Sequence, residues 1–441
     1  MLPREGIEMP DGARVVVVGG GLAGLSAAAF AARAGARVSL IERISEPGGR
    51  ARTREDRGFL FNHGPHALYQ GGAAMAALRE LGIDPAGSAA PTSGALAIRN
   101  GRLHALPGGL VSLLTTGLLR LPAKLELARL LASLPRIDTA SLVGVTLGDY
   151  LRGALRHSAT REVAAAVVRL TGYANAPEEI SAGAALAQLQ LGLGTGVRYL
   201  DGGWQRLVDA LARCAREAGA ELRYGARVER VEHDGSVRAL RLADGERIVC
   251  DAVILALGPD EASALVDEGR NPYLGAAARA CLPVRAACLD LGLESLPVPK
   301  RSFALGIDRA SYFSVHSAAA KLAPEGSALI QAARYLAPDE SPTREEIESG
   351  FDALLDLVQP GWREVTVTRR VMRELVVVHD LPRASRGGLA GRTPGAVDGI
   401  ANLMLAGDWV GPTGMLSDAC FASARVAASA SVGARELGVA A

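Results

Sequence analysis

Residues 13–54 read ARVVVVGGGLAGLSAAAFAARAGARVSLIERISEPGGRARTR, and this stretch decides how the 441-residue chain folds. Residues 15–18 are an unbroken run of valines, typical of a parallel strand that is buried on both faces, and glycines follow directly. Residues 22–34 continue as an alanine-rich helix that Gly35 ends, and residues 37–41 form a second strand. The sequence therefore predicts the opening of an α/β fold with a parallel sheet.

The glycines between the first strand and the helix have the spacing of a phosphate-binding turn, G-x-G-x-x-G. Gly19 permits the tight turn, Gly21 lets a pyrophosphate approach the backbone, and Gly24 lets the helix pack closely against the strand. Glu42 follows the second strand, where its carboxylate can accept both ribose hydroxyls of an adenosine. Glycine-rich turns also arise for packing alone, but the full order of strand, turn, helix, strand and acid favours a Rossmann-type dinucleotide site.

The next segment, PGGRART at residues 47–53, resembles the G-G-R-x-x-T element of the FAD-containing amine oxidase superfamily. That family includes monoamine oxidases, protoporphyrinogen oxidases and phytoene desaturases. In it the arginine, here Arg50, and the glycine backbone, here Gly49, face the FAD pyrophosphate. Ordinary NAD dehydrogenases lack this element, so the resemblance implies that the dinucleotide is FAD.

The segment GFLFNHGPH, residues 58–66, extends the resemblance. A strand here runs into Gly64-Pro65, which in the family passes beside the isoalloxazine ring of FAD. His66 follows the proline, and an imidazole titrates near neutral pH. We therefore predict His66 as the catalytic residue. A histidine that is hydrogen-bonded to a loop carbonyl is the structural alternative, and His316 at a strand end is a weaker rival.

Two more segments resemble family elements that contact FAD. A valine, here Val228, pairs its backbone with adenine. Gly407-Asp408 ends a strand before a helix predicted over residues 416–437, and in the family this acid binds the ribityl or pyrophosphate part while the helix N-terminus stabilises reduced, anionic flavin. The predicted cofactor-binding residues are Gly19, Gly21, Leu22, Ala23, Gly24, Glu42, Arg43, Gly49, Arg50, Gly64, Pro65, His66, Val228, Gly407, Asp408, Met415 and Leu416.

The resemblance covers essentially the whole chain and implies two interleaved domains, as the length also favours. The FAD-binding domain is expected to comprise residues 1–90, 195–275 and 395–441. The substrate domain, an antiparallel sheet covered by helices, is expected to comprise residues 91–194 and 276–394. A hairpin turning at Asn100-Gly101 is predicted at the start of the substrate domain.

Composition excludes several other functions. The net charge of +1 gives no broad attraction to nucleic acid, so nucleic acid is not an expected partner. The five cysteines are widely spaced and lack a C-x-x-C pair, which argues against a disulfide framework and a structural zinc site, and no metal is expected. The first twelve residues contain no apolar signal region, so the cytoplasm is the expected location.

Residues 106–134 are apolar and helical, but prolines, glycines and charges interrupt them well short of the roughly 18 apolar residues that a membrane span needs. In the family the corresponding helices cover the substrate cavity, and in some members they enter the bilayer surface. We expect core helices here because no basic amphipathic face accompanies the apolar one. Peripheral contact with a membrane stays the alternative.

FAD performs the hydride chemistry while the protein orients the substrate, so no acid–base pair is obligatory. Monoamine oxidases usually carry a lysine on a substrate-domain strand, but the matching segment, residues 281–293, has Arg285 and no lysine. The Gly-Pro, the Gly-Asp and the apolar helical cover resemble the phytoene desaturase and protoporphyrinogen oxidase branch. We therefore predict an enzyme with noncovalent FAD that removes a hydride from a carbon of a hydrophobic or cyclic small molecule. The alternatives are a flavin amine oxidase, a redox-neutral flavin isomerase, or a non-catalytic lipid-binding protein similar to the GDP-dissociation inhibitors.

Overall fold

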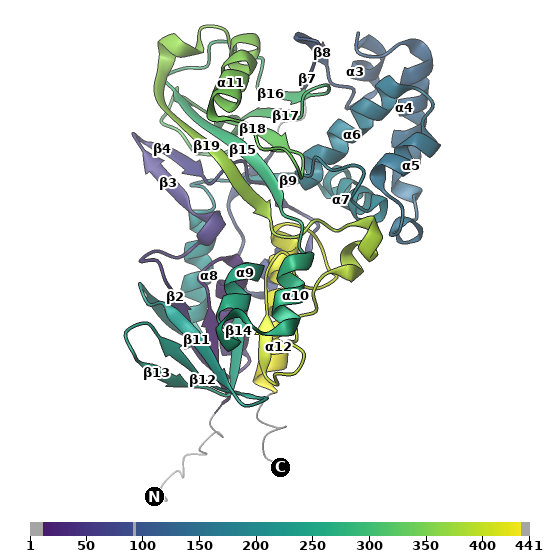
Figure 1. Cartoon of the computed structure of the whole chain (residues 1–441). Coiled ribbons are helices and arrows are strands. Elements are labelled where there is room, and N and C mark those ends of the chain that lie inside the picture. Colours follow the sequence, from purple (N-terminus) through teal and green to yellow (C-terminus); the bar gives the residue numbers. More distant parts are fainter. Residues whose placement is uncertain (1–11, 91–93, 434–441) are drawn as a thin grey trace, which may run out of the picture.

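Two large β-sheets organise the chain, and they lie toward opposite ends of the molecule in Figure 1. The computed structural model describes residues 12–90 and 94–433. The expectation about an N-terminal signal concerns residues 1–11, which lie outside these ranges.

The smaller sheet is parallel throughout, as the valine run predicts. Its strands in spatial order are β10 (Glu221–Tyr224), β2 (Arg37–Glu42), β1 (Arg14–Val18), β14 (Ala252–Leu255) and β20 (Leu403–Leu405). The strand order reverses direction at β1, and doubly wound sheets bind ligands at the carboxyl ends of strands next to such a switch point. The fold of the opening stretch is therefore confirmed.

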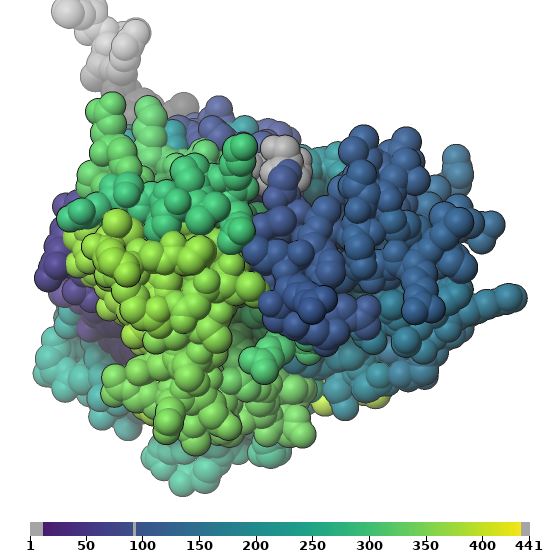
Figure 2. All heavy atoms as spheres, turned by 90° about the horizontal axis from the view of Figure 1, so that it is seen from above, coloured from purple at the N-terminus to yellow at the C-terminus, as the bar shows by residue number. Residues whose placement is uncertain are grey.

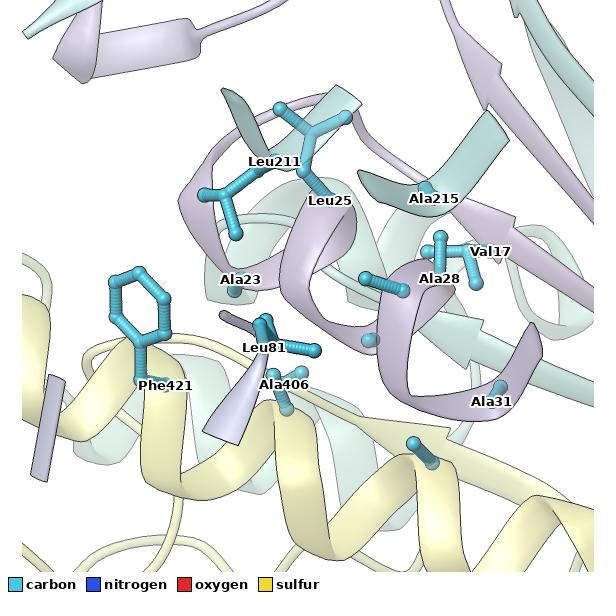
Figure 3. Close-up of a cluster of buried hydrophobic side chains, with 14 of the residues drawn as sticks. Val17, Ala23, Leu25, Ala28, Ala31, Leu81, Leu211, Ala215, Ala406 and Phe421 are labelled. Atoms are coloured by element: carbon cyan, nitrogen blue, oxygen red, sulfur yellow. The ribbon is translucent and has the colours of Figure 1, made fainter. Parts of the chain in front are cut away.

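Helices cover one face of this sheet. Figure 3 shows α1 (Leu22–Arg33) packed between α8 (Gln205–Glu217) and α12 (Ser417–Val432). The buried side of α1 consists largely of alanines such as Ala28 and Ala31, and these small side chains let both neighbouring helices approach closely. The alanine-rich composition of the opening stretch thus serves tight helix packing.

Two smaller groups of elements cover the opposite face of the parallel sheet. They are a three-stranded sheet of β11 (Val228–His233), β12 (Val237–Leu242) and β13 (Arg247–Val249), and the helices α9 (Pro259–Ala264) and α10 (Pro272–Ala280). With both faces covered, the strands of the parallel sheet are almost wholly buried.

The larger sheet has seven strands. In spatial order they are β19 (Thr366–Val378), β15 (Val284–Leu293), β18 (Ala328–Leu336), β17 (Ser311–Val315), β16 (Phe303–Gly306), β7 (Leu96–Arg99) and β8 (Arg102–Ala105). The β7–β8 turn at Asn100-Gly101 has positive φ at both residues, 50° and 68°, as the predicted hairpin requires.

The expectation of a purely antiparallel substrate-domain sheet is wrong at one position, because β7 pairs with β16 in parallel. A parallel pair needs a long connection rather than a tight turn. The chain between β8 and β15 supplies this connection, because it runs through helices and through the parallel sheet before the larger sheet resumes.

The two faces of the larger sheet differ because side chains alternate along each strand. One face is aliphatic, with Leu289 and Leu291 among its residues, and packs against α11 (Arg344–Val358). The other face carries Cys288 and Asp290 together with aromatic and amide side chains of neighbouring strands. This second face contributes to the cavity described below.

Five helices extend the larger sheet at its β16–β8 end, at the upper right of Figure 1. They are α3 (Leu110–Thr115), α4 (Leu121–Ser133), α5 (Leu147–Ala154), α6 (Ser158–Gly172) and α7 (Ala182–Thr195). The predicted helices over residues 106–134 therefore exist as two short pieces, α3 and α4.

The expectation that α3 and α4 are core helices is wrong for one side of each. In α4 the buried residues Ala123 and Leu127 lie four apart, so that Leu121 and Leu125 face solvent instead. The exposed fractions are 73% for Leu110, 74% for Val111, 61% for Leu114, 65% for Leu121 and 50% for Leu125. Within residues 12–90 and 94–433, no helix has both the length and the apolar character that crossing a membrane requires.

Short elements join the two large sheets. They are the hairpin of β3 (Thr53–Asp56) and β4 (Phe59–Asn62), the sheet of β5 (Leu68–Tyr69), β9 (Val197–Leu200) and β6 (Gly87–Ala89), and α2 (Ala73–Glu80). At the other end of the chain, α12 ends at Val432, before the predicted end at residue 437, and residues 434–437 lie outside the described ranges.

Candidate cofactor and active site

A cavity of about 640 Å³ opens at the carboxyl ends of β1, β2 and β14 and extends to the second face of the larger sheet. All predicted cofactor-binding residues line this cavity except Gly24 and Met415. Met415 is buried, at 1% exposure, just before α12. The fold thus brings together motifs that lie hundreds of residues apart in the sequence.

The glycine turn leaves one open position and one packed position. A Cβ added to Gly21 would meet no atom within 4 Å, so a ligand can approach the backbone there. A Cβ added to Gly24 would lie 1.8 Å from the carbonyl oxygen of Gly19, so Gly24 serves the contact between helix and strand. Gly19 itself has a φ of 107°, which strongly favours glycine.

Glu42 ends β2 with its carboxylate fixed by two backbone groups. The NH of Gly20 donates to Oε2 at 2.6 Å, and the NH of Ile44 donates to Oε1 at 2.9 Å. Each carboxylate oxygen has a second lone pair that can accept another hydrogen bond. Glu42 therefore stands at the cavity wall in a fixed orientation, suited to bind hydroxyl groups.

Arg50 and Asp408, from two separate motifs, form an ion pair of 2.7 Å at the cavity. The same Nη1 of Arg50 donates to the carbonyl of Val377 at 2.9 Å. Burial by itself would raise the pKa of the Asp408 carboxyl, but the charge of Arg50 and the hydrogen bond from His379 hold that pKa well below its ordinary value. Asp408 is therefore an anion at neutral pH.

His379 completes this group, and the sequence did not identify it. Its Nδ1 lies 2.9 Å from Oδ1 of Asp408, and it lines the cavity at the end of β19. No recognisable motif surrounds His379 in the sequence. It follows β19, which belongs to the larger sheet and not to the parallel sheet that carries the dinucleotide turn. Other lining residues outside the predicted set are Tyr173, Trp204, Ala286, Cys288 and Leu375.

The bend after β4 places Gly64, Pro65 and His66 in the cavity wall. Gly64 has a φ of 85°, and a Cβ added there would lie 3.2 Å from Sγ of Cys288. The backbone of the bend is thus pressed against the second face of the larger sheet, and glycine is required at this position.

His66 is held by a backbone carbonyl and by an indole ring. Its Nδ1 lies 2.9 Å from the carbonyl oxygen of Gly64, and its ring lies 4.9 Å from that of Trp204. Burial lowers the pKa of His66 to about 4. Its imidazole is therefore neutral at neutral pH. His316, the weaker rival, is buried, is not among the lining residues, and bonds to the hydroxyl of Tyr312 at 3.0 Å.

The first turn of α12 contributes Leu416, Ser417 and Cys420 to the cavity wall, so the positive end of a helix lies at the cavity. Val228 lines the cavity from the start of β11. Burial raises the pKa of the Cys420 thiol to about 12, so this thiol is protonated and weakly nucleophilic.

These residues fit FAD. The open backbone at Gly21 suits a phosphate, the fixed carboxylate of Glu42 suits a ribose, and the helix terminus suits an electron-rich ring edge. Arg50 would add a guanidinium near the phosphates, while Asp408 balances its charge.

Comparison with known proteins agrees with this fit. The family model for flavin containing amine oxidoreductases matches residues 22–430. A coproporphyrinogen III oxidase of Propionibacterium freudenreichii subsp. freudenreichii is 27% identical over 456 residues, which cover 84% of this chain and 83% of that protein. A phytoene dehydrogenase of Streptomyces griseus is 31% identical over 289 residues, which cover 59% of this chain and 56% of that protein. A solved structure of an oxidoreductase from Methanosarcina mazei has a TM-score of 0.73 and 19% identity, and the match covers 94% of this chain and 99% of that chain.

The family model begins at α1 and ends within α12, so it covers the whole larger sheet, every strand of the parallel sheet except β1, and the cavity lining from Leu22 to Cys420. The solved structure shares the fold over nearly its whole length. The chain therefore belongs to the flavin containing amine oxidoreductase family and is an FAD-dependent oxidoreductase.

Proposed function

We propose that this enzyme removes a hydride from a carbon of a hydrophobic or cyclic small molecule. When bound, FAD supplies the hydride acceptor. The observation that carries the proposal is the uncharged wall at the larger-sheet end of the cavity. The residues of this wall are Tyr173, Ala286, Cys288 and Leu375. An uncharged wall favours an apolar substrate, because a charged one would lose its hydration without gaining a partner.

Tyrosine hydroxyls lie within and behind this wall. The hydroxyl of Tyr173 lies 3.3 Å from the carbonyl oxygen of Pro65, and its ring meets that of Tyr335 edge-on at 5.9 Å. The hydroxyl of Tyr335 is buried and has no hydrogen-bond partner among the described residues. Tyr335 is 0% exposed and does not line the cavity, whereas Tyr173 does. We therefore propose that Tyr173 orients the substrate at the cavity wall, with Tyr335 packed behind it.

Amine oxidation is less favoured. The lysines of the chain are Lys124, Lys300 and Lys321, and none of them lines the cavity. Arg285, on the strand where monoamine oxidases usually carry a lysine, donates to Glu374 and to the carbonyl oxygens of residues 337, 338 and 340. Its charge is therefore satisfied away from the cavity.

A non-catalytic lipid-binding role is also less favoured, because the intact glycine turn, Glu42 and the Arg50–Asp408 pair surround a cavity suited to a dinucleotide. The names of the two curated relatives give coproporphyrinogen III and phytoene as the molecules on which those proteins act. Both names support a hydrophobic or cyclic substrate for this chain.

Bleaching of the bound flavin tests the proposal. The purified yellow protein would be mixed without oxygen with a porphyrinogen, with a carotenoid precursor and with primary and secondary amines, and its absorbance in the flavin bands would be followed. We expect a compound of the first two classes to bleach the flavin. Bleaching by amines alone would overturn the proposal in favour of an amine oxidase.

We also propose that the enzyme contacts a membrane surface through α3 and α4. Figure 2 shows this part of the chain, in blue, at the molecular surface beside the green part of the larger sheet. The five exposed aliphatic side chains of α3 and α4 form an apolar patch, and residues 102–136 carry five basic residues but only Glu126 as an acid. The carboxylate of Glu126 already has partners, because it accepts hydrogen bonds from the backbone NH groups of Arg156 and His157. Exposed apolar side chains on a segment with a net positive charge suit an anionic lipid surface.

Flotation with phosphatidylglycerol vesicles tests this contact. We expect the wild-type protein to float with the vesicles at low salt and to bind less at high salt, because salt screens the basic residues. The double variant Leu110→Gln, Leu114→Gln should lose binding. The control Val426→Gln changes a side chain that is 61% exposed on α12 and should bind as wild type. Equal flotation of all three proteins, or none by the wild type, would contradict the membrane contact.

A further inference from the structure

Three polar side chains form a row across the larger sheet, on the face that looks toward the cofactor cavity. Asp290 in β15 lies opposite Gln331 in β18 and opposite Arg370 in β19. Asp290 and Gln331 are both 0% exposed. Burying polar groups in the middle of a sheet is unfavourable unless they are fully hydrogen-bonded, and aliphatic residues would pack there at lower free energy. The row therefore calls for a role other than stability.

The row is bonded to the bend that carries His66. Nε2 of Gln331 lies 3.0 Å from the carbonyl oxygen of Gly64, 3.0 Å from Oδ1 of Asp290 and 3.4 Å from the carbonyl oxygen of Asn62. The Gly64 carbonyl is also the partner of His66 Nδ1. One amide and one carbonyl thus connect the buried carboxyl of Asp290 to the imidazole of His66.

The hydrogen bonds that link Asp290, Gln331 and Gly64 compete with one another. The amide of Gln331 has two hydrogens but three oxygens within reach, while Oδ2 of Asp290 and Oε1 of Gln331 are buried with no partner in the described part of the chain. A carboxylate accepts a hydrogen bond from Gln331 strongly, whereas a neutral carboxylic acid accepts more weakly and can donate. The state of Asp290 therefore decides how firmly Gln331 holds Gly64.

The groups around Asp290 favour neither the carboxylate nor the neutral carboxylic acid strongly. Arg370 faces it from β19 and also approaches His63 of the bend, with Nη2 3.5 Å from Nδ1. Cys288 lies two residues away on the same face of β15. Burial raises the pKa of Asp290 to about 7, although the hydrogen bond from Gln331 and the charge of Arg370 favour the anion.

We propose that Asp290 is a positioning residue for the cofactor-facing bend: through Gln331 its carboxyl sets the position of the Gly64 carbonyl and so the orientation of His66 beside FAD. The inference rests on the bend facing FAD and does not depend on which substrate the enzyme oxidises. Asp290 acts through other residues and contacts neither cofactor nor substrate itself.

The test uses the FAD-loaded protein and the visible circular dichroism of its bound flavin, which reports the surroundings of the ring. Spectra would be recorded from about pH 5 to about pH 9, a range that spans the titration of histidines and of carboxyls with raised pKa. We expect the wild-type spectrum to change in one transition near neutral pH and Asp290→Asn to remove it. The matched control is Asp418→Asn, because Asp418 is also a buried acid but bonds to the NH of Ala74 and is not among the lining residues. It should keep the transition.

A second variant keeps the inference falsifiable if Asp290→Asn does not hold FAD. Gln331→Met removes the link between Asp290 and Gly64 with little change in volume, so its flavin spectrum should differ from wild type and should not change with pH. The proposal would be overturned if Asp290→Asn or Gln331→Met kept the transition of the wild type, or if the wild type showed no transition. Loss of the transition in Asp418→Asn would also overturn it.

Discussion

Nη1 of Arg50 lies 2.7 Å from Oδ2 of Asp408, although 358 positions separate the two residues in the sequence. Each belongs to a motif that the family resemblance assigned to the cofactor, and the structure pairs them with each other. Arg50 also binds the carbonyl of Val377, and Asp408 binds His379. The ion pair therefore fastens the end of β19, a strand of the larger sheet, to the cavity beside the parallel sheet.

Removing one partner of this pair should destabilise the protein. Arg50→Met would leave the carboxylate of Asp408, only 3% exposed, with His379 as its remaining partner. A fully buried pair broken in this way costs about 3 to 5 kcal/mol. We expect about 2 kcal/mol, because the side chain of Arg50 is 38% exposed. Urea unfolding of the FAD-free protein measures the difference.

The matched control is Arg14→Met. Arg14 and Asp251 have the same separation of 2.7 Å, but their side chains are 46% and 22% exposed. Exposed pairs contribute about 0 to 1 kcal/mol, so this variant should change stability by less than Arg50→Met. An equal loss in both variants would contradict the role given to the buried pair.

The pair also gives the stability a pH dependence of known sign. The pKa of Asp408 is lower in the folded chain than in the unfolded chain, so its stabilising contribution is present above the ordinary pKa of an aspartate, about 4, and is lost as the pH falls below it. In Arg50→Met the folded pKa of Asp408 should rise, and acid unfolding should then depend less steeply on pH. Unfolding curves measured at several acidic pH values check this expectation.

Glu42→Ala should weaken FAD binding by about 1 to 3 kcal/mol, because the ribose hydroxyls would lose their acceptor. The NH groups of Gly20 and Ile44 would also lose theirs. Titration of the FAD-free protein with FAD measures the affinity. Glu46→Ala is the control, since Glu46 is exposed nearby but does not line the cavity. An unchanged affinity in Glu42→Ala would contradict the assignment.

His66→Ala should keep FAD bound while slowing flavin reduction by roughly 100-fold or more, if His66 orients substrate or transfers a proton as a neutral imidazole. Because burial lowers the pKa of His66 to about 4, the wild-type rate should show no step from this residue near pH 6.5. Stopped-flow reduction across this pH range tests both statements. His157→Ala, at an exposed histidine bound to Glu126, is the control. If the flavin of His66→Ala were reduced at the wild-type rate, the role of His66 would be only structural, through its hydrogen bond to Gly64.

FAD should be bound noncovalently. Cys420 and Cys288 line the cavity, but burial raises the pKa of both thiols, so neither is present as the thiolate that would attack a flavin. Precipitation with trichloroacetic acid should release all yellow colour into the supernatant. A yellow washed pellet would refute the prediction.

Local sequence patterns predicted the structure correctly where residues close in sequence determine it. The valine run, the glycine spacing and Glu42 predicted β1, the turn and the end of β2, because a buried parallel strand and a phosphate-binding turn depend on residues close in sequence. The Asn100-Gly101 turn was likewise predicted, since positive φ at two successive positions selects these residues.

Pattern failed where burial depends on distant segments. The apolar helices over residues 106–134 looked like core, yet Leu110 and Leu121 face solvent, because only the packed fold determines which side of a helix finds a neighbour. The parallel pairing of β7 with β16 also depends on where a long connection returns.

The candidate site also has features that the sequence predicted and features that only the structure showed. The sequence by itself determined the fold class and the dinucleotide turn with its acid, because these motifs carry the geometry of a phosphate turn and of a ribose acid within a few positions. The resemblance to the family added FAD and further residues of the cavity wall, but most of the lining residues were not predicted. Only the tertiary structure decided that Arg50 pairs with Asp408 and His379, that His66 is a neutral imidazole, and that Asp290 reaches the bend through Gln331. The physical reason is that ion pairs, desolvation and cross-strand contacts depend on distances between residues that are tens to hundreds of positions apart, and no local pattern records those distances.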